Sequence, residues 1–189
     1  MPDLNRYADP PRDAATLAAR RAALVDQLGW LEDEAAALAP LLAGLPAWAV
    51  EQAPLETDLS AKETFAALAA LDRDVYSDWV ARVQAEEAPD LAAPDPLPRV
   101  DGANGRALGA LLADLRAARA DLRATFEAVP AEAWGRPATL DGRTTDLYGV
   151  ALAVVQRDAD HLKALAYRLH EADLRPRTPE SDLPRPPSP

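Results

Sequence analysis

The chain has 189 residues, a formal net charge of -11 at neutral pH and no cysteine. Its length suits one domain, its acidity repels the phosphates of nucleic acids, and the lack of cysteine excludes disulfides, thiolate metal sites and a cysteine nucleophile. Apolar residues make up 49% of the chain but aromatic residues only 5%, which favours close-packed helices over a sheet. No segment approaches the roughly 18 apolar residues of a membrane span, and residues 1–13 lack the apolar stretch of a signal peptide. We therefore expect a cytoplasmic protein that binds neither membrane nor nucleic acid.

The first 45 residues predict an arm followed by a long helix. Residues 1–12 hold three prolines and no apolar periodicity, so we expect a flexible arm. From Asp13 onward, leucines and alanines recur at helical spacing as far as Leu45. Pro40 interrupts this pattern and should kink or end the helix near Ala39.

A second helix should begin at a capping box. Ser60 and Glu63 form the S-x-x-E pattern of a helix N-terminus, in which each side chain bonds the backbone N–H of the other residue. Apolar residues continue at helical spacing from Phe65 to Val83, and the pattern fades near residues 86–90. Residues 89–105 are rich in proline and are expected to form a long loop.

Two further helices complete the pattern. The third is expected over residues 104–129 and the fourth over residues 145–172, with Thr144 or Thr145 as its N-cap. The connector between them contains Asp141-Gly142, a turn signal. Residues 173–189 are rich in proline, serine and charge and should form a disordered tail. The sequence thus predicts an all-α protein with one four-helix bundle over residues 13–172, whose core is the usual place for a site.

Two segments resemble the DinB/YfiT-like superfamily of four-helix bundles, which includes metal-dependent hydrolases and thiol-dependent transferases. They are "DLSAKETFAALAALDRDVYSDW" in the second helix and "LDGRTTDLYGVALAVVQRDADHLKAL" in the fourth. The first is similar to a family pattern K-E-x-x-x-H-L, and the second to a pattern in which a DG turn precedes H-x-x-x-H. The resemblance covers most of residues 13–172.

The resemblance implies a divalent metal held by three histidines, and this sequence departs from that set. The three positions fall on Ala67, Arg157 and His161, so that only the last is a histidine. A catalytic zinc ion normally has three protein ligands, and the fixed charge of Arg157 would repel a dication. We expect no metal and no other cofactor. Under the alternative, His161 and carboxylates hold a harder ion such as Mn²⁺.

Four polar residues are candidates for a ligand pocket. On the fourth helix, Asp158 and His161 fall inside the apolar face and Arg157 lies at its edge; on the second helix, Asp72 falls among apolar residues. Because buried charges must be paired, Arg157 is the expected partner of one carboxylate, whereas Arg119 is expected to snorkel to solvent. The group could be a satisfied polar cluster, a small-ligand pocket or a carboxylate-assisted metal site.

These residues suggest a function without catalysis. We assign no catalytic residue, and we expect a DinB-like bundle that has lost its metal and binds a small molecule or a protein. One alternative is a metal-dependent hydrolase or thiol S-transferase that uses His161 with carboxylates. The other is a structural or interaction protein that forms a homodimer through its helix faces.

Overall fold

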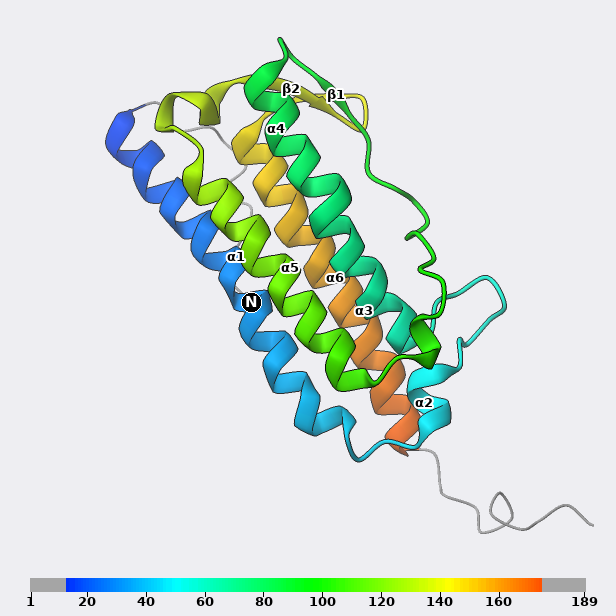
Figure 1. Ribbon diagram of the computed structural model, residues 1–189. Coiled ribbons are helices and arrows are strands. Elements are labelled where there is room, and N and C mark those ends of the chain that lie inside the picture. The colour runs from blue at the N-terminus through cyan, green and yellow to red at the C-terminus, as the bar shows by residue number, and fades with distance from the viewer. Residues whose placement is uncertain (1–12, 175–189) are drawn as a thin grey trace, which may run out of the picture.

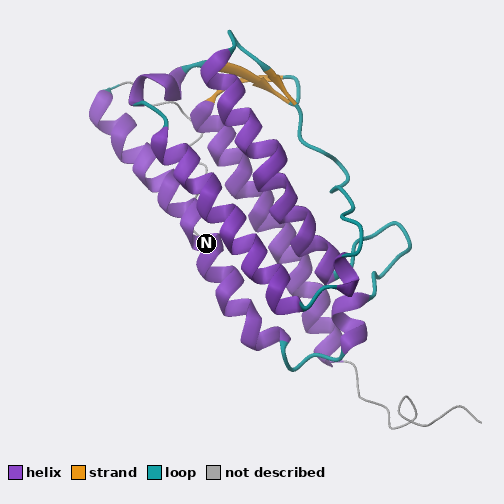
Figure 2. Cartoon of the chain, in the orientation of Figure 1, coloured by secondary structure: helices purple, strands orange, loops and turns teal. Residues whose placement is uncertain are grey.

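Four long helices lie side by side in the computed structural model, which describes residues 13–174 (Figures 1 and 2). The first, α1 (Ala14–Leu42), begins where Asp13 Oδ1 accepts a hydrogen bond from the backbone N–H of Thr16, at 2.8 Å. Pro40 lies in its last turn, so the helix ends close to the predicted point. The predicted arm, residues 1–12, and residues 175–189 of the predicted tail lie outside the described range. No helix in the described range is long and apolar enough to cross a membrane.

The second long helix contains a π-helical turn. It consists of α3 (Ala61–Ala70), the π-helical residues Leu71–Tyr76 and α4 (Ser77–Ala85), and it follows the short helix α2 (Ala47–Glu51). The capping box is confirmed, because the backbone N–H of Ser60 donates to Glu63 Oε2 at 2.7 Å and that of Glu63 donates to Ser60 Oγ at 3.1 Å. Such π-helical turns occur often at functional sites. This one contains Asp72.

A long connection sets the topology of the bundle. After α4 the chain returns along the length of the bundle before α5 (Leu108–Ala128) begins, so α3, α4 and α5 run in one direction and α1 and α6 (Leu147–Leu174) in the other (Figure 1). Helix α1 packs against α5 and α6, and α3 packs against α5. The apolar stripes predicted for the four helices therefore meet in one core.

A small sheet at one end of the bundle corrects the all-α prediction. Strand β1 (Asp90–Leu91) pairs in parallel with β2 (Pro137–Leu140), and β2 pairs antiparallel with β3 (Arg143–Asp146) (Figure 2). Asp141 and Gly142 join β2 to β3 with φ angles of 50° and 75°, as a two-residue hairpin turn of mirror-image type requires. The strands are too short to show an alternating pattern, so only the turn was visible in the sequence.

The hairpin also moves the start of the last helix. Thr144 and Thr145 belong to β3, where they pair with Thr139 and Ala138, so the prediction that one of them is the N-cap was wrong. Asp146 takes this role, because its Oδ1 accepts a hydrogen bond from the backbone N–H of Gly149 at 3.0 Å. Helix α6 ends at Leu174, two residues beyond the predicted end of the bundle.

Candidate functional site

Three charged side chains from three helices meet in the core. Arg119, from the middle of α5, binds Asp72 through Nη2 at 2.9 Å and Asp158 of α6 through Nη1 at 2.7 Å. The residues Asp72, Arg119 and Asp158 are 0%, 2% and 1% exposed. We call them the Asp–Arg–Asp cluster. The expectation that Arg119 snorkels to solvent was wrong, and it is Arg119, not Arg157, that neutralises the buried carboxylates.

The electrostatics of this cluster follow from its burial. Two carboxylates and one guanidinium would carry one uncompensated negative charge in a medium that solvates charge poorly. Burial raises the pKa of Asp72 to about 8, although Arg119 acts in the opposite direction. Burial also raises the pKa of Asp158, opposed by Arg119 and His161. A proton on Asp72 at neutral pH therefore leaves Asp158 and Arg119 as a balanced ion pair.

Little space remains beside the cluster. A cavity of about 10 Å³ borders Arg119 and Asp158 and is otherwise lined by Leu31, Ala35, Leu68, Leu115 and Leu162. Such a volume holds about one water molecule. Asp158 Oδ1 and Arg119 Nε both lack a hydrogen-bond partner among the described residues. For Asp72 and Asp158, this geometry favours the polar-cluster interpretation over a ligand pocket.

Arg157 has a different partner from those predicted. Its Nη2 binds Asp141 in the turn between β2 and β3, and its guanidinium lies 5.9 Å from the centre of the Trp79 ring. Asp141 Oδ1 also accepts a hydrogen bond from the backbone N–H of Ala93 at 3.1 Å. Arg157 therefore fastens the sheet to α6. The sequence could not show this pairing, because the position of Asp141 depends on the fold of the hairpin.

His161 lines a cleft on the outside of the bundle. The cleft has a volume of about 720 Å³, within the range of small-molecule sites. The half-buried His161 shares its wall with residues from α3, α6, the segment before α3 and the long connection. They are Thr57, Asp58, Leu59, Thr64, Asp95, Pro96, Leu97, Pro98, Arg99, Ala164 and Arg168. Of the four predicted pocket residues, His161 is the one that borders this cleft.

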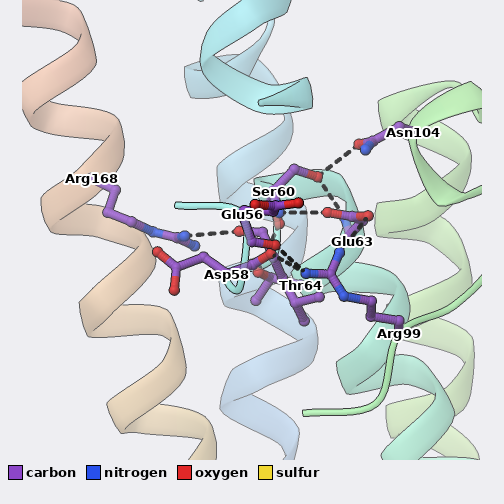
Figure 3. A network of polar contacts seen from close by, with 9 residues as sticks. Glu56, Asp58, Ser60, Glu63, Thr64, Arg99, Asn104 and Arg168 are labelled. Atoms are coloured by element: carbon purple, nitrogen blue, oxygen red, sulfur yellow. Dashed lines mark hydrogen bonds and ion pairs between the residues drawn. The ribbon is translucent and has the colours of Figure 1, made fainter. Parts of the chain in front are cut away.

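Two arginines hold the wall of the cleft in place (Figure 3). Arg99 Nη2 donates to the backbone carbonyls of Glu56 and Asp58 at 2.9 and 2.8 Å, and Arg168 Nη1 donates to the carbonyl of Leu59 at 2.9 Å. Sequence reasoning missed both arginines. Their acceptors are backbone oxygens, which every residue has, so the sequence does not indicate which of them is bonded.

The positions that the family resemblance assigns to a metal do not fit that ion. Ala67 is fully buried and offers only a methyl group, which has no donor atom. Arg157 is a permanent cation bonded to Asp141. Among the side chains of residues 13–170, no group of three or more histidine, aspartate or glutamate residues is placed to hold a metal.

A comparison with solved structures bears on the fold. The bundle has the fold of YfiT. The solved structure is that of YfiT from Bacillus subtilis, a probable metal-dependent hydrolase with an unusual four-helix bundle topology. The two align with a TM-score of 0.60 over 79% of this chain and 87% of YfiT, at 11% sequence identity. The resemblance drawn from the sequence is thereby confirmed for the YfiT-like fold, and an identity this low says nothing of activity. No protein-family model and no curated protein sequence matches the chain.

Proposed function

We propose that this protein is a metal-independent binding protein for a small molecule, built on a YfiT-like fold, and that its ligand occupies the cleft beside His161. One observation carries the proposal. His161 borders a cleft of about 720 Å³, whereas the positions of the other two expected metal ligands hold a buried methyl group and an ion-paired guanidinium.

The chemistry of the cleft supports a polar ligand. An imidazole can donate and accept hydrogen bonds, and Asp58, Asp95, Arg99 and Arg168 bring charges of both signs to the same wall. A dication is disfavoured in this cleft because one imidazole supplies too few ligands.

Metal analysis tests this proposal directly. We expect protein purified without chelator to contain no stoichiometric divalent ion, and calorimetry with Zn²⁺ or Mn²⁺ to show no tight binding. Introducing histidine at two positions, with Ala67→His and Arg157→His, is expected to create affinity for Zn²⁺. A stoichiometric ion in the native protein that disappears in His161→Ala would overturn the proposal. A fragment screen by NMR, in which hits are lost in His161→Ala, would locate the ligand.

A metal-dependent hydrolase or thiol S-transferase is the second candidate. The likeness to YfiT favours it, as does the presence of Asp58 and Asp95 in the same cleft as His161. Carboxylate oxygens suit Mn²⁺. The Mn²⁺ titration above decides between the two candidates, because only the enzyme needs an ion bound at His161.

A homodimer is the third candidate. Trp30 and Leu41 of α1 are 50% and 70% exposed, and their spacing of 11 residues is about three helical turns, which places them on one face. Light scattering at two protein concentrations tests this candidate. A monomer at both concentrations would exclude it.

A further inference from the structure

A second cleft lies at the end of the bundle opposite the sheet. It is formed by α2, the segment after it and the C-terminal part of α6, and its volume is about 430 Å³. Helix α2 lies beside the C-terminal end of α6 in Figure 1. Its wall contains one cation, one anion and one amide among apolar side chains. The lining residues are Trp48, Ala49, Gln52, Ala53, Pro54, Leu55, Asp58, Ala61, Leu165, Arg168 and Leu169.

One side of this cleft is apolar. Trp48 and Leu55 remain 41% and 65% exposed at its mouth, whereas Leu165 and Leu169 of α6 are 2% and 8% exposed. A large exposed indole and a leucine beside a cleft give apolar area that a ligand could cover. Covering this area would favour binding, because it removes apolar surface from water.

The other side carries a pair of opposite charges. Asp58 and Arg168 both line this cleft and are half-buried. Arg168 Nη1 donates to the carbonyl of Leu59 at 2.9 Å, and Arg168 Nε is buried without a hydrogen-bond acceptor among the described residues. This guanidinium is thus partly removed from water, which increases the gain from an anionic partner.

The cleft is held in shape before any ligand arrives. Arg99 binds the carbonyls of Glu56 and Asp58, and Lys62 Nζ binds Glu51 Oε1 at 2.7 Å, which fastens the end of α2 to α3. A preformed wall reduces the entropy that binding must overcome.

We propose that this cleft binds a free α-amino acid with an apolar side chain. Its carboxylate would contact Arg168, its ammonium group Asp58, and its side chain Trp48, Leu165 and Leu169. The negative charge of Asp58 disfavours a ligand with two negative charges, and the positive charge of Arg168 disfavours one with two positive charges. A purely apolar ligand would displace water from both charged groups without offering them hydrogen bonds in return. The proposal does not depend on the cleft beside His161, although Asp58 and Arg168 border both.

Calorimetry with matched ligands tests the proposal. We expect saturable binding of L-phenylalanine and L-leucine, and binding at least about tenfold weaker for N-acetyl-L-phenylalanine, which lacks the ammonium group, and for L-phenylalaninamide, which lacks the carboxylate. Absence of saturable binding at about 10 mM, or equal affinity for phenylalanine and both derivatives, would overturn it.

Single-residue variants test each of the proposed contacts with the ligand. Asp58→Asn and Trp48→Ala should each weaken phenylalanine binding by about tenfold or more. Arg168→Met should weaken phenylalanine but leave phenylalaninamide unchanged. Because Arg168 also holds Leu59, Arg168→Lys serves as a second variant, expected to retain part of the affinity. His161→Ala, which changes only the other cleft, should leave phenylalanine binding intact. Equal loss for phenylalanine and its amide in Arg168→Met would overturn the assigned contact.

Discussion

The protonation of Asp72 in the Asp–Arg–Asp cluster can be tested by Asp72→Asn. This change replaces a carboxyl group with an amide of the same shape that cannot ionise. Burial raises the pKa of Asp72 from about 4 to about 8, so folding must take up a proton between these pH values. The native protein binds more protons than the unfolded chain in this window, and the free energy of unfolding therefore falls as the pH rises.

The size of this fall in the free energy of unfolding follows from the uptake of one proton. The loss is about 1.4 kcal/mol for each pH unit between the two pKa values, or about 3 kcal/mol between pH 5 and pH 7. The amide of the Asp72→Asn variant needs no proton, so the variant should gain this amount relative to the native protein over the same interval. Carboxylates outside the Asp–Arg–Asp cluster contribute equally to both proteins and cancel in the difference.

Urea denaturation followed by circular dichroism measures the difference. Asp74→Asn is the matched control for the loss of one carboxylate, because Asp74 is exposed on the same π-helical turn. A stability difference for Asp72→Asn that does not change between pH 5 and pH 7 would refute the reasoning. A loss of several kcal/mol in the free energy of unfolding of Asp72→Asn at pH 7 would also refute the reasoning. Such a loss would mean that Asp72 is ionised in the folded protein and balances the charge of Arg119.

Three other variants test the remaining contacts. Arg119→Met should destabilise the protein by about 3–5 kcal/mol, measured by urea denaturation, because it leaves the Asp158 carboxylate buried without a cation; a loss under about 1 kcal/mol would contradict the burial of an ionised Asp158. Asp141→Ala releases Arg157 and should cost about 1 kcal/mol, because the ion pair is partly exposed to solvent, with faster amide exchange in β1 and β2 as the specific sign. Ser60→Ala removes one half of the capping box and should cost about 1 kcal/mol by thermal unfolding, whereas an unchanged midpoint would mean that the cap contributes nothing.

The helices were readable from the sequence because their signals are local. The capping box at Ser60 and Glu63 depends on residues three apart, and the apolar stripe from Phe65 to Val83 depends on a repeat within one helix. Only part of the hairpin could be predicted from the sequence. Asp141-Gly142 marked the turn, but strands of four residues and a strand of two cannot be told from a loop by periodicity.

The candidate site was predicted less well, because its contacts join distant parts of the chain. Asp72 and Asp158 were correctly expected in the interior, since both fall on apolar helix faces. Their partner was misassigned. Arg157 is the neighbour of Asp158 in sequence, but Arg119 lies 39 residues away from it and meets it only through helix packing.

By itself, the sequence determined the number and approximate bounds of the long helices, the acidic charge, and the presence of a single histidine among the three expected metal positions. These follow from residue identity and short-range spacing. Only the tertiary structure decided which arginine neutralises the core, that Arg157 binds the hairpin, and that His161 and Trp48 border two neighbouring clefts. Side chains far apart in the chain meet according to how the helices pack, and a periodic pattern does not encode that packing.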